Sequence, residues 1–130
     1  MAEKQGPAYL KDHRLKGQAL EFEVAAEMGD LVRRVRGNKS KRTAKTLVKE
    51  GPLRVLIVAL DEGGELQEHS VDGPFSVQCL LGRVVVNVEG EDHQLSTGDL
   101  LVVDAGVPHD VSAKEPSALL ITIVGTQHEG

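Results

Sequence analysis

The sequence predicts an all-β fold, an antiparallel sandwich or barrel, with one α-helix in front of it. From residue 46 to residue 124, short apolar runs alternate with turn residues at hairpin spacing, which is typical of antiparallel sheets. The stretch 24–35 instead repeats its apolar residues with a helical period, which indicates an amphipathic helix. We therefore expect one helix followed by roughly nine short strands.

The composition fits one globular domain. The chain has 130 residues, of which 40% are hydrophobic and 27% charged, the range of an ordinary globular protein. We expect residues 1–45 to form an arm, a helix and a basic loop that pack on the barrel, residues 46–125 to form the barrel, and 126–130 to form a tail. Because the only aromatic residues are two Phe and one Tyr, the predicted core is aliphatic.

Charge and hydropathy exclude several classes of partner. The formal net charge of −5 argues against general binding to a phosphate backbone, and the few aromatic residues leave no platform on which bases could stack. No apolar run approaches the roughly 20 residues of a membrane span, and residues 1–13 lack the apolar region of a signal peptide. We expect a cytoplasmic protein that binds neither nucleic acid nor membranes. Cys79, the single cysteine, is interpreted as a small buried hydrophobe.

The predicted helix begins near Val24 and ends before Gly37, a span of about three turns. Arg33 and Arg34 near its end suit the negative pole of the helix dipole. The basic stretch that follows, 37–45, is predicted to be a loop. We interpret it as a solvated face or a contact to an acidic partner rather than a nucleic-acid patch, because the remaining chain is acidic. The apolar stripe of the helix comprises Val24, Ala25, Met28, Leu31, Val32 and Val35.

The strands follow in order, each ended by turn residues. TLVKE turns at Gly51-Pro52 into LRVLIVAL, which is apolar enough to be covered on both faces over part of its length. The last strand, SALLITIV, reads as buried. Further turns are predicted at 73–75, 82, 89–92, 96–99 and 105–108.

Two histidines lie in the central part of the predicted strand region. His69 lies shortly after the glycines at 63 and 64, and His109 ends the stretch 63–109. If the barrel closes, both imidazoles can face one cavity, although each could instead lie at a strand end or at the barrel rim. An unperturbed imidazole titrates near neutral pH, so this pair suits hydrogen bonding, acid–base chemistry or metal ligation.

The spacing of these residues resembles that of the cupin superfamily, specifically its small single-domain members. The first motif of that family runs glycine, five residues, His-x-His, three or four residues, Glu, six residues, glycine. Gly63, His69 and Gly82 fit this motif, whereas Val71 stands at the second histidine and Phe75 at the glutamate. The resemblance implies a double-stranded β-helix, or jelly roll.

The second motif of the family runs glycine, five residues, Pro-x-Gly, two residues, His, three residues, Asn. Gly98, Gly106 and His109 fit it, while Asp104 replaces the proline and Ala113 the asparagine. The resemblance covers about residues 50 to 124, and it leaves the helix unexplained.

The departures from the motifs bear on metal binding. Most catalytic cupins hold their metal with three histidines and one glutamate, and two of those positions, Val71 and Phe75, are apolar here. Divalent sites normally have at least three protein ligands. We therefore expect either no metal or a weakly bound Fe, Mn, Ni or Zn ion, held by His69 and His109.

The predicted pocket is lined by His69, His109, Val71, Phe75 and Gln78. Gln78, like Asn87, is an amide in an apolar strand that needs a partner if it is buried. Strand parity allows each of these two residues to lie on the inner or the outer face of its sheet. The sequence contains no nucleophile elbow and no phosphate-binding glycine loop. No catalytic residue is assigned, and whether the chain is an enzyme stays open.

Three functions compete at this point. The first is a protein of unknown specific activity that binds a small molecule in a largely apolar barrel pocket. The alternative is a metal-dependent cupin enzyme, a dioxygenase or an isomerase, with a reduced two-histidine ligand set. The third is a dimer module whose helix and arm pack on a neighbour's sheet. Because small cupins are commonly dimers, the resemblance also implies a homodimer.

Overall fold

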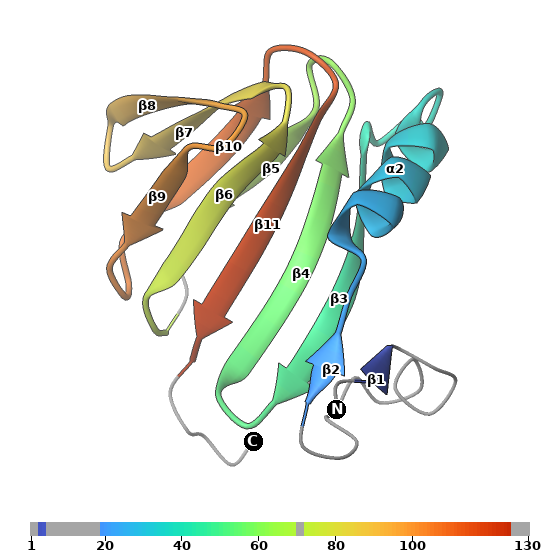
Figure 1. The fold of residues 1–130 in the computed structure, drawn as a ribbon. Helices are drawn as coiled ribbons and strands as arrows, with labels where there is room; N and C mark the ends of the chain where they lie inside the picture. Colours follow the sequence, from blue (N-terminus) through green and yellow to red (C-terminus); the bar gives the residue numbers. More distant parts are fainter. Residues whose placement is uncertain (1–2, 5–18, 70–71, 126–130) are drawn as a thin grey trace.

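Two antiparallel sheets face each other and form a jelly-roll barrel (Figure 1). The computed structural model describes residues 3–4, 19–69 and 72–125. A five-stranded sheet has the order β3-β4-β11-β6-β9, and a four-stranded sheet has the order β5-β10-β7-β8. The predicted all-β fold with one preceding helix is confirmed. A short parallel pair, β1 (Glu3–Lys4) and β2 (Leu20–Glu21), precedes the helix.

The strand bounds follow the turns that the sequence predicts. The large sheet contains β3 (Arg42–Glu50), β4 (Leu53–Leu60), β6 (Phe75–Leu81), β9 (Leu100–Val103) and β11 (Ser117–Val124). The small sheet contains β5 (Glu65–His69), β7 (Arg83–Val88), β8 (Glu91–Ser96) and β10 (His109–Ala113).

The core between the sheets is aliphatic, as predicted. In β6, Phe75, Val77 and Cys79 are buried while the residues between them are partly exposed, which is the alternation of a strand with one face on a core. Cys79 is fully buried, and this burial raises the pKa of its thiol. A protonated, enclosed thiol is a weak nucleophile, which agrees with the interpretation of Cys79 as a hydrophobe.

A second apolar cluster lies on the outer face of the large sheet, under the helix α2 (Val24–Val35) (Figure 1). Leu31 and Val35 of the helix are buried against Ile57 and Ala59 of β4. Val58, which lies between those two residues, belongs to the inner cluster. β4 is therefore apolar at every buried position because both of its faces are covered.

The exposed side of α2 is polar, and one ion pair ties it to the sheet. Lys45 Nζ of β3 lies 2.7 Å from Glu27 Oε1, and Arg34 Nε lies 3.4 Å from Asp30 Oδ2 within the helix. Four residues of the predicted apolar stripe, Val24, Leu31, Val32 and Val35, pack on the chain's own sheet. The stripe is therefore mostly covered within the chain, and the dimer module stays a prediction.

The predicted basic loop is shorter than expected. The sequence predicts a loop over 37–45, but β3 already begins at Arg42 and pairs with β4 from Arg42 opposite Leu60 onward. β3 is an edge strand of its sheet. Charged side chains are well suited to such a strand because they discourage pairing with other chains, and here they hide the strand pattern in the sequence.

None of the helical segments in the described part of the chain has the length and hydropathy of a membrane-spanning helix.

Candidate functional site

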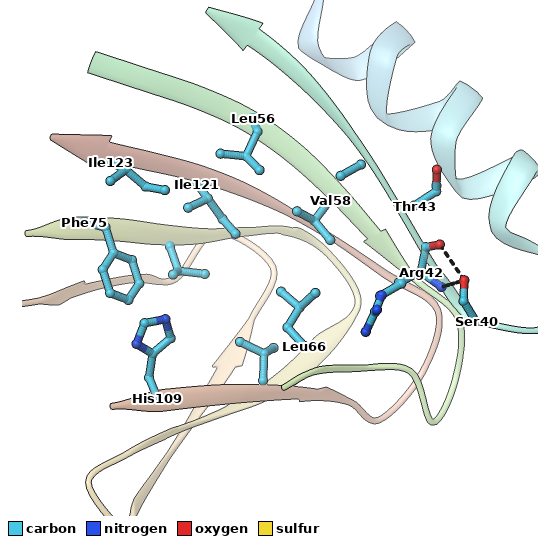
Figure 2. A pocket seen from close by; sticks show the side chains of 13 residues that line it. Ser40, Arg42, Thr43, Leu56, Val58, Leu66, Phe75, His109, Ile121 and Ile123 are labelled. Atoms are coloured by element: carbon cyan, nitrogen blue, oxygen red, sulfur yellow. Dashed lines mark hydrogen bonds between the residues drawn. The ribbon is translucent and has the colours of Figure 1, made fainter. Parts of the chain in front are cut away.

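A cavity of about 500 Å³ lies between the two sheets (Figure 2). Three of its lining residues, Ser40, Arg42 and Ala44, are exposed, so the cavity reaches solvent beside β3. The described lining consists of Ser40, Arg42, Thr43, Ala44, Leu56, Val58, Leu66, Phe75, Val77, His109, Val111, Ile121 and Ile123.

The large sheet supplies an apolar wall. Leu56 lies opposite Ile121, and Ile123 lies opposite Phe75, in the antiparallel register of β11 with its two neighbours. Residues that lie opposite each other in such a pair project to the same face of the sheet. The register therefore brings side chains from three strands together on one side of the cavity, as Figure 2 shows.

The small sheet supplies the opposite wall, with His109 as its polar member. His109 is only 4% exposed, and its ring centroid lies 4.4 Å from that of Phe75. The Nδ1 atom lies 3.0 Å from the carbonyl oxygen of Val107. Because a carbonyl only accepts hydrogen bonds, Nδ1 carries the hydrogen of this contact.

Arg42 is the charged member of the lining. It lies on the inner face of β3, since its partner in the register is Leu60, a member of the core cluster between the sheets. Figure 2 shows its side chain extending from β3 into the space between the sheets. One guanidinium nitrogen, Nη1, donates a hydrogen bond to the carbonyl oxygen of Glu65 over 3.3 Å. The Oγ atom of Ser40 donates to the carbonyl oxygen of Arg42 over 3.0 Å.

The structure brings two of the predicted pocket residues, Phe75 and His109, together on the cavity wall. His69 is described by its backbone, which lies opposite His109 in the pairing of β5 with β10. Val71 lies outside the described residues.

The prediction that Gln78 lines the pocket is wrong. Gln78 lies on the face of β6 opposite to Phe75 and Val77, and its amide donates to the carbonyl oxygen of Gly98 over 3.3 Å. Asn87 likewise finds local partners, because its amide donates to Asp92 Oδ1 over 2.8 Å at the β7–β8 hairpin.

Sequence patterns do not predict Arg42 as a lining residue, because the basic stretch 37–45 is typical of a solvated loop. Arg42, Ala44 and Thr46 are every second residue of β3 and so share one face of the strand. None of the three is a large hydrophobe. An inner face that borders an open cavity at a sheet edge does not need apolar side chains, so hydrophobic periodicity gives no signal there.

The described side chains do not form a metal site with three ligands. No group of three His, Cys, Asp or Glu side chains close enough to share an ion occurs among the residues whose side chains the structure describes. Phe75, which stands at the glutamate position of the motif, places a ring without donor atoms against His109. The His109 tautomer, with Nδ1 on a backbone carbonyl, is nevertheless the one that metal-binding histidines commonly adopt.

Comparison with known proteins gives a family and several similar folds. The family model of the cupin domain matches residues 56–125. No curated protein matches the chain. A conserved protein of unknown function from Streptococcus pyogenes is similar in structure, with 24% identity and a TM-score of 0.67, over 90% of this chain and 95% of that one.

Two further solved structures are similar. A cupin superfamily protein from Desulfitobacterium hafniense has 15% identity and a TM-score of 0.67, over 88% of this chain and 97% of its own. The salicylate 1,2-dioxygenase from Pseudaminobacter salicylatoxidans has 20% identity and a TM-score of 0.66, over 76% of this chain and 33% of its own. At these identities the likeness shows the fold alone. Arg42 and the rest of β3 lie before the matched range 56–125.

Proposed function

The chain belongs to the cupin domain family, and on this basis we propose that it binds a small, largely apolar molecule between its two sheets. The observation that carries this proposal is the cavity of about 500 Å³, whose described lining is aliphatic apart from a few polar groups and the ring of Phe75. Small-molecule sites are typically concave, mostly apolar and furnished with a few polar groups that orient the ligand.

The lining supports a particular way of holding such a molecule. Burying apolar surface contributes about 25 cal/mol per Å², so a bicyclic ring that buries ~200 Å² gains about 5 kcal/mol before the cost of immobilisation. The ring of Phe75 offers a face or an edge for stacking. The remaining wall, from Leu56, Val58, Ile121 and Ile123, is contributed by strands that are paired along their length, so little reorganisation is needed on binding.

A substitution that fills the cavity tests this proposal. Ala44 lines the cavity, is exposed and lies opposite Val58, so an indole at this position can project into the cavity without displacing core side chains. We expect Ala44→Trp to weaken binding of the neutral dye N-phenyl-1-naphthylamine about 100-fold, a loss of about 2.7 kcal/mol. A fluorescence titration measures this, with excitation outside indole absorption.

The matched control is Ala26→Trp, which adds the same indole at an exposed position of α2 outside the described lining. This variant is expected to bind the dye like the wild type. Equal affinity of Ala44→Trp and Ala26→Trp would contradict binding inside the barrel.

A metal-dependent cupin enzyme, such as a dioxygenase or an isomerase, is the second candidate, and one specific observation favours it. The backbone of His69 lies opposite that of His109 in the pairing of β5 with β10, so the two predicted ligands occupy neighbouring backbone positions of the small sheet. A bound divalent ion would supply Lewis-acid or redox chemistry. His109 would ligate it through Nε2, while the Val107 carbonyl orients the ring.

Metal content decides between the candidates. On the metalloenzyme hypothesis, protein purified without an affinity tag contains about one equivalent of Fe, Mn, Ni or Zn by elemental mass spectrometry. The double variant His69→Ala/His109→Ala then loses it. A wild type that stays free of metal after incubation with each of the four ions would contradict this candidate and leave the first.

A homodimer also belongs to the proposal. Leu100 and Val102 of the edge strand β9 are 59% and 66% exposed, and exposed apolar side chains on an edge strand are typical of association surfaces. Light scattering that finds a monomer at high protein concentration would contradict it. The cytoplasmic location stays a prediction from the sequence.

A further inference from the structure

We propose that the molecule bound in the barrel is an organic carboxylate, whose carboxylate group pairs with Arg42 while its apolar body lies between the sheets. This inference rests on the proposed binding function and specifies the chemical class of the ligand. It also gives Arg42 the role of a specificity-determining residue.

The first argument for a carboxylate ligand is the charge of the cavity lining. Among the described lining residues Arg42 is the one side chain with a fixed charge, and none of them is an aspartate or a glutamate. None of the carboxylates whose side chains the structure describes forms an ion pair with Arg42, and the Glu65 carbonyl accepts from one of its N–H groups. An arginine has several N–H donors in a planar fork, so the others remain available to a ligand.

The chemistry of the guanidinium carries the second step. Its fork matches the two oxygens of a carboxylate, and such charge-assisted, bidentate hydrogen bonds are stronger than neutral ones. The aliphatic walls exclude water on one side, which strengthens the attraction relative to the open surface. Because Arg42 is itself exposed, it remains hydrated in the empty cavity and the net gain on binding is moderate.

The arrangement of the two polar ends carries the third step. Figure 2 shows Arg42 and His109 toward opposite ends of the lining, separated by aliphatic side chains that include Val58 and Leu66. A ligand that places its carboxylate at Arg42 therefore extends an apolar body toward the rings of Phe75 and His109. A molecule that is polar along its whole length would leave its groups unpaired against this wall.

The role of Arg42 is a property of this chain rather than of the matched family range, since β3 precedes residue 56. The edge strand β3 places the guanidinium of Arg42 where the cavity meets solvent. Ser40, Arg42 and Ala44 are all exposed lining residues. A carboxylate on an incoming ligand can thus bind at the mouth while the rest of the molecule enters the barrel.

The test compares 2-naphthoate with its neutral analogue 2-naphthamide by isothermal titration calorimetry at neutral pH. The two probes share the ring and differ in the charge of the polar group. We expect the wild type to bind naphthoate about tenfold more tightly. Arg42→Met should remove this preference by weakening naphthoate alone, and Arg42→Lys should retain part of it, because an ammonium keeps the charge but not the fork.

Arg36→Met is the matched control. Arg36 directly follows α2, is exposed and lies outside the described lining, so this variant changes the net charge equally and should keep the tenfold preference. Thermal unfolding of each variant shows that it is folded. A preference that persists in Arg42→Met would overturn the inference.

The outcomes also separate the inference from the proposal on which it rests. If the wild type binds both naphthyl probes equally and Ala44→Trp weakens both, the barrel binds small molecules and the role of Arg42 is wrong. If neither naphthyl probe nor the neutral dye binds the wild type, both proposals are wrong.

Discussion

Gly73→Ala is expected to destabilise the protein by about 3 kcal/mol or more, a large share of the stability of a domain. Gly73 is buried in the turn that leads into β6, and a Cβ atom at this position would overlap the carbonyl oxygen of Val124. That segment is fixed by backbone hydrogen bonds, from Val124 N to Pro74 O over 3.0 Å and from Gly125 N to Pro52 O over 2.7 Å. Both the turn and the end of β11 must shift to admit a methyl group.

Urea denaturation measures this effect, and Gly29→Ala provides the control. Gly29 lies inside α2, where an added Cβ would make an ordinary contact of 3.6 Å with the Arg33 guanidinium. The same chemical change should there raise the free energy of unfolding by up to about 1 kcal/mol, because alanine favours a helix interior more than glycine does. An unchanged unfolding midpoint for Gly73→Ala would contradict the close approach at this turn.

Leu31→Ala is expected to lower the free energy of unfolding by about 2–5 kcal/mol. Leu31 is fully buried between α2 and the outer face of the large sheet, in the cluster that contains Leu47 and Ile57. Truncation leaves a cavity under the helix, and the hydrogen-bonded strands beneath it cannot move far enough to close it. Because the ligand cavity lies on the other face of this sheet, the folded fraction should still bind N-phenyl-1-naphthylamine.

Leu81→Ala makes the same truncation at the end of β6, outside the cluster under α2. Leu81 is 39% exposed, so the free energy of unfolding should fall by about 1 kcal/mol or less, well below the loss expected for Leu31→Ala. Chemical denaturation of both variants compares them directly. Equal losses would contradict the placement of α2 as a cover for the sheet.

The helix and most strands could be predicted because their periodicity is set by burial. The stripe through Leu31 and Val35 follows the turn of a helix that packs on one side, and the unbroken apolar run of β4 reflects cover on both faces. The start of β3 could not be predicted in this way. Its inner positions Arg42 and Ala44 border a cavity open to solvent, where no burial selects for hydrophobic side chains.

Only the part of the site that the motif spacing covers could be predicted from the sequence. The spacing located His109 and Phe75, which meet on the cavity wall. Gln78 could have been excluded by parity, since Phe75, Val77 and Cys79 already define the inner face of β6. The place of Arg42 in the lining depends on the pairing of β3 with β4 and on the opposing sheet, which are long-range contacts that no local pattern encodes.

The most direct test of binding inside the barrel is a crystal structure of the protein with 2-naphthoate. We predict the naphthyl ring between the two sheets, against Phe75 and Ile121, with the carboxylate at Arg42. A ring bound instead on the exposed apolar surface of β9, at Leu100 and Val102, would contradict the proposed function.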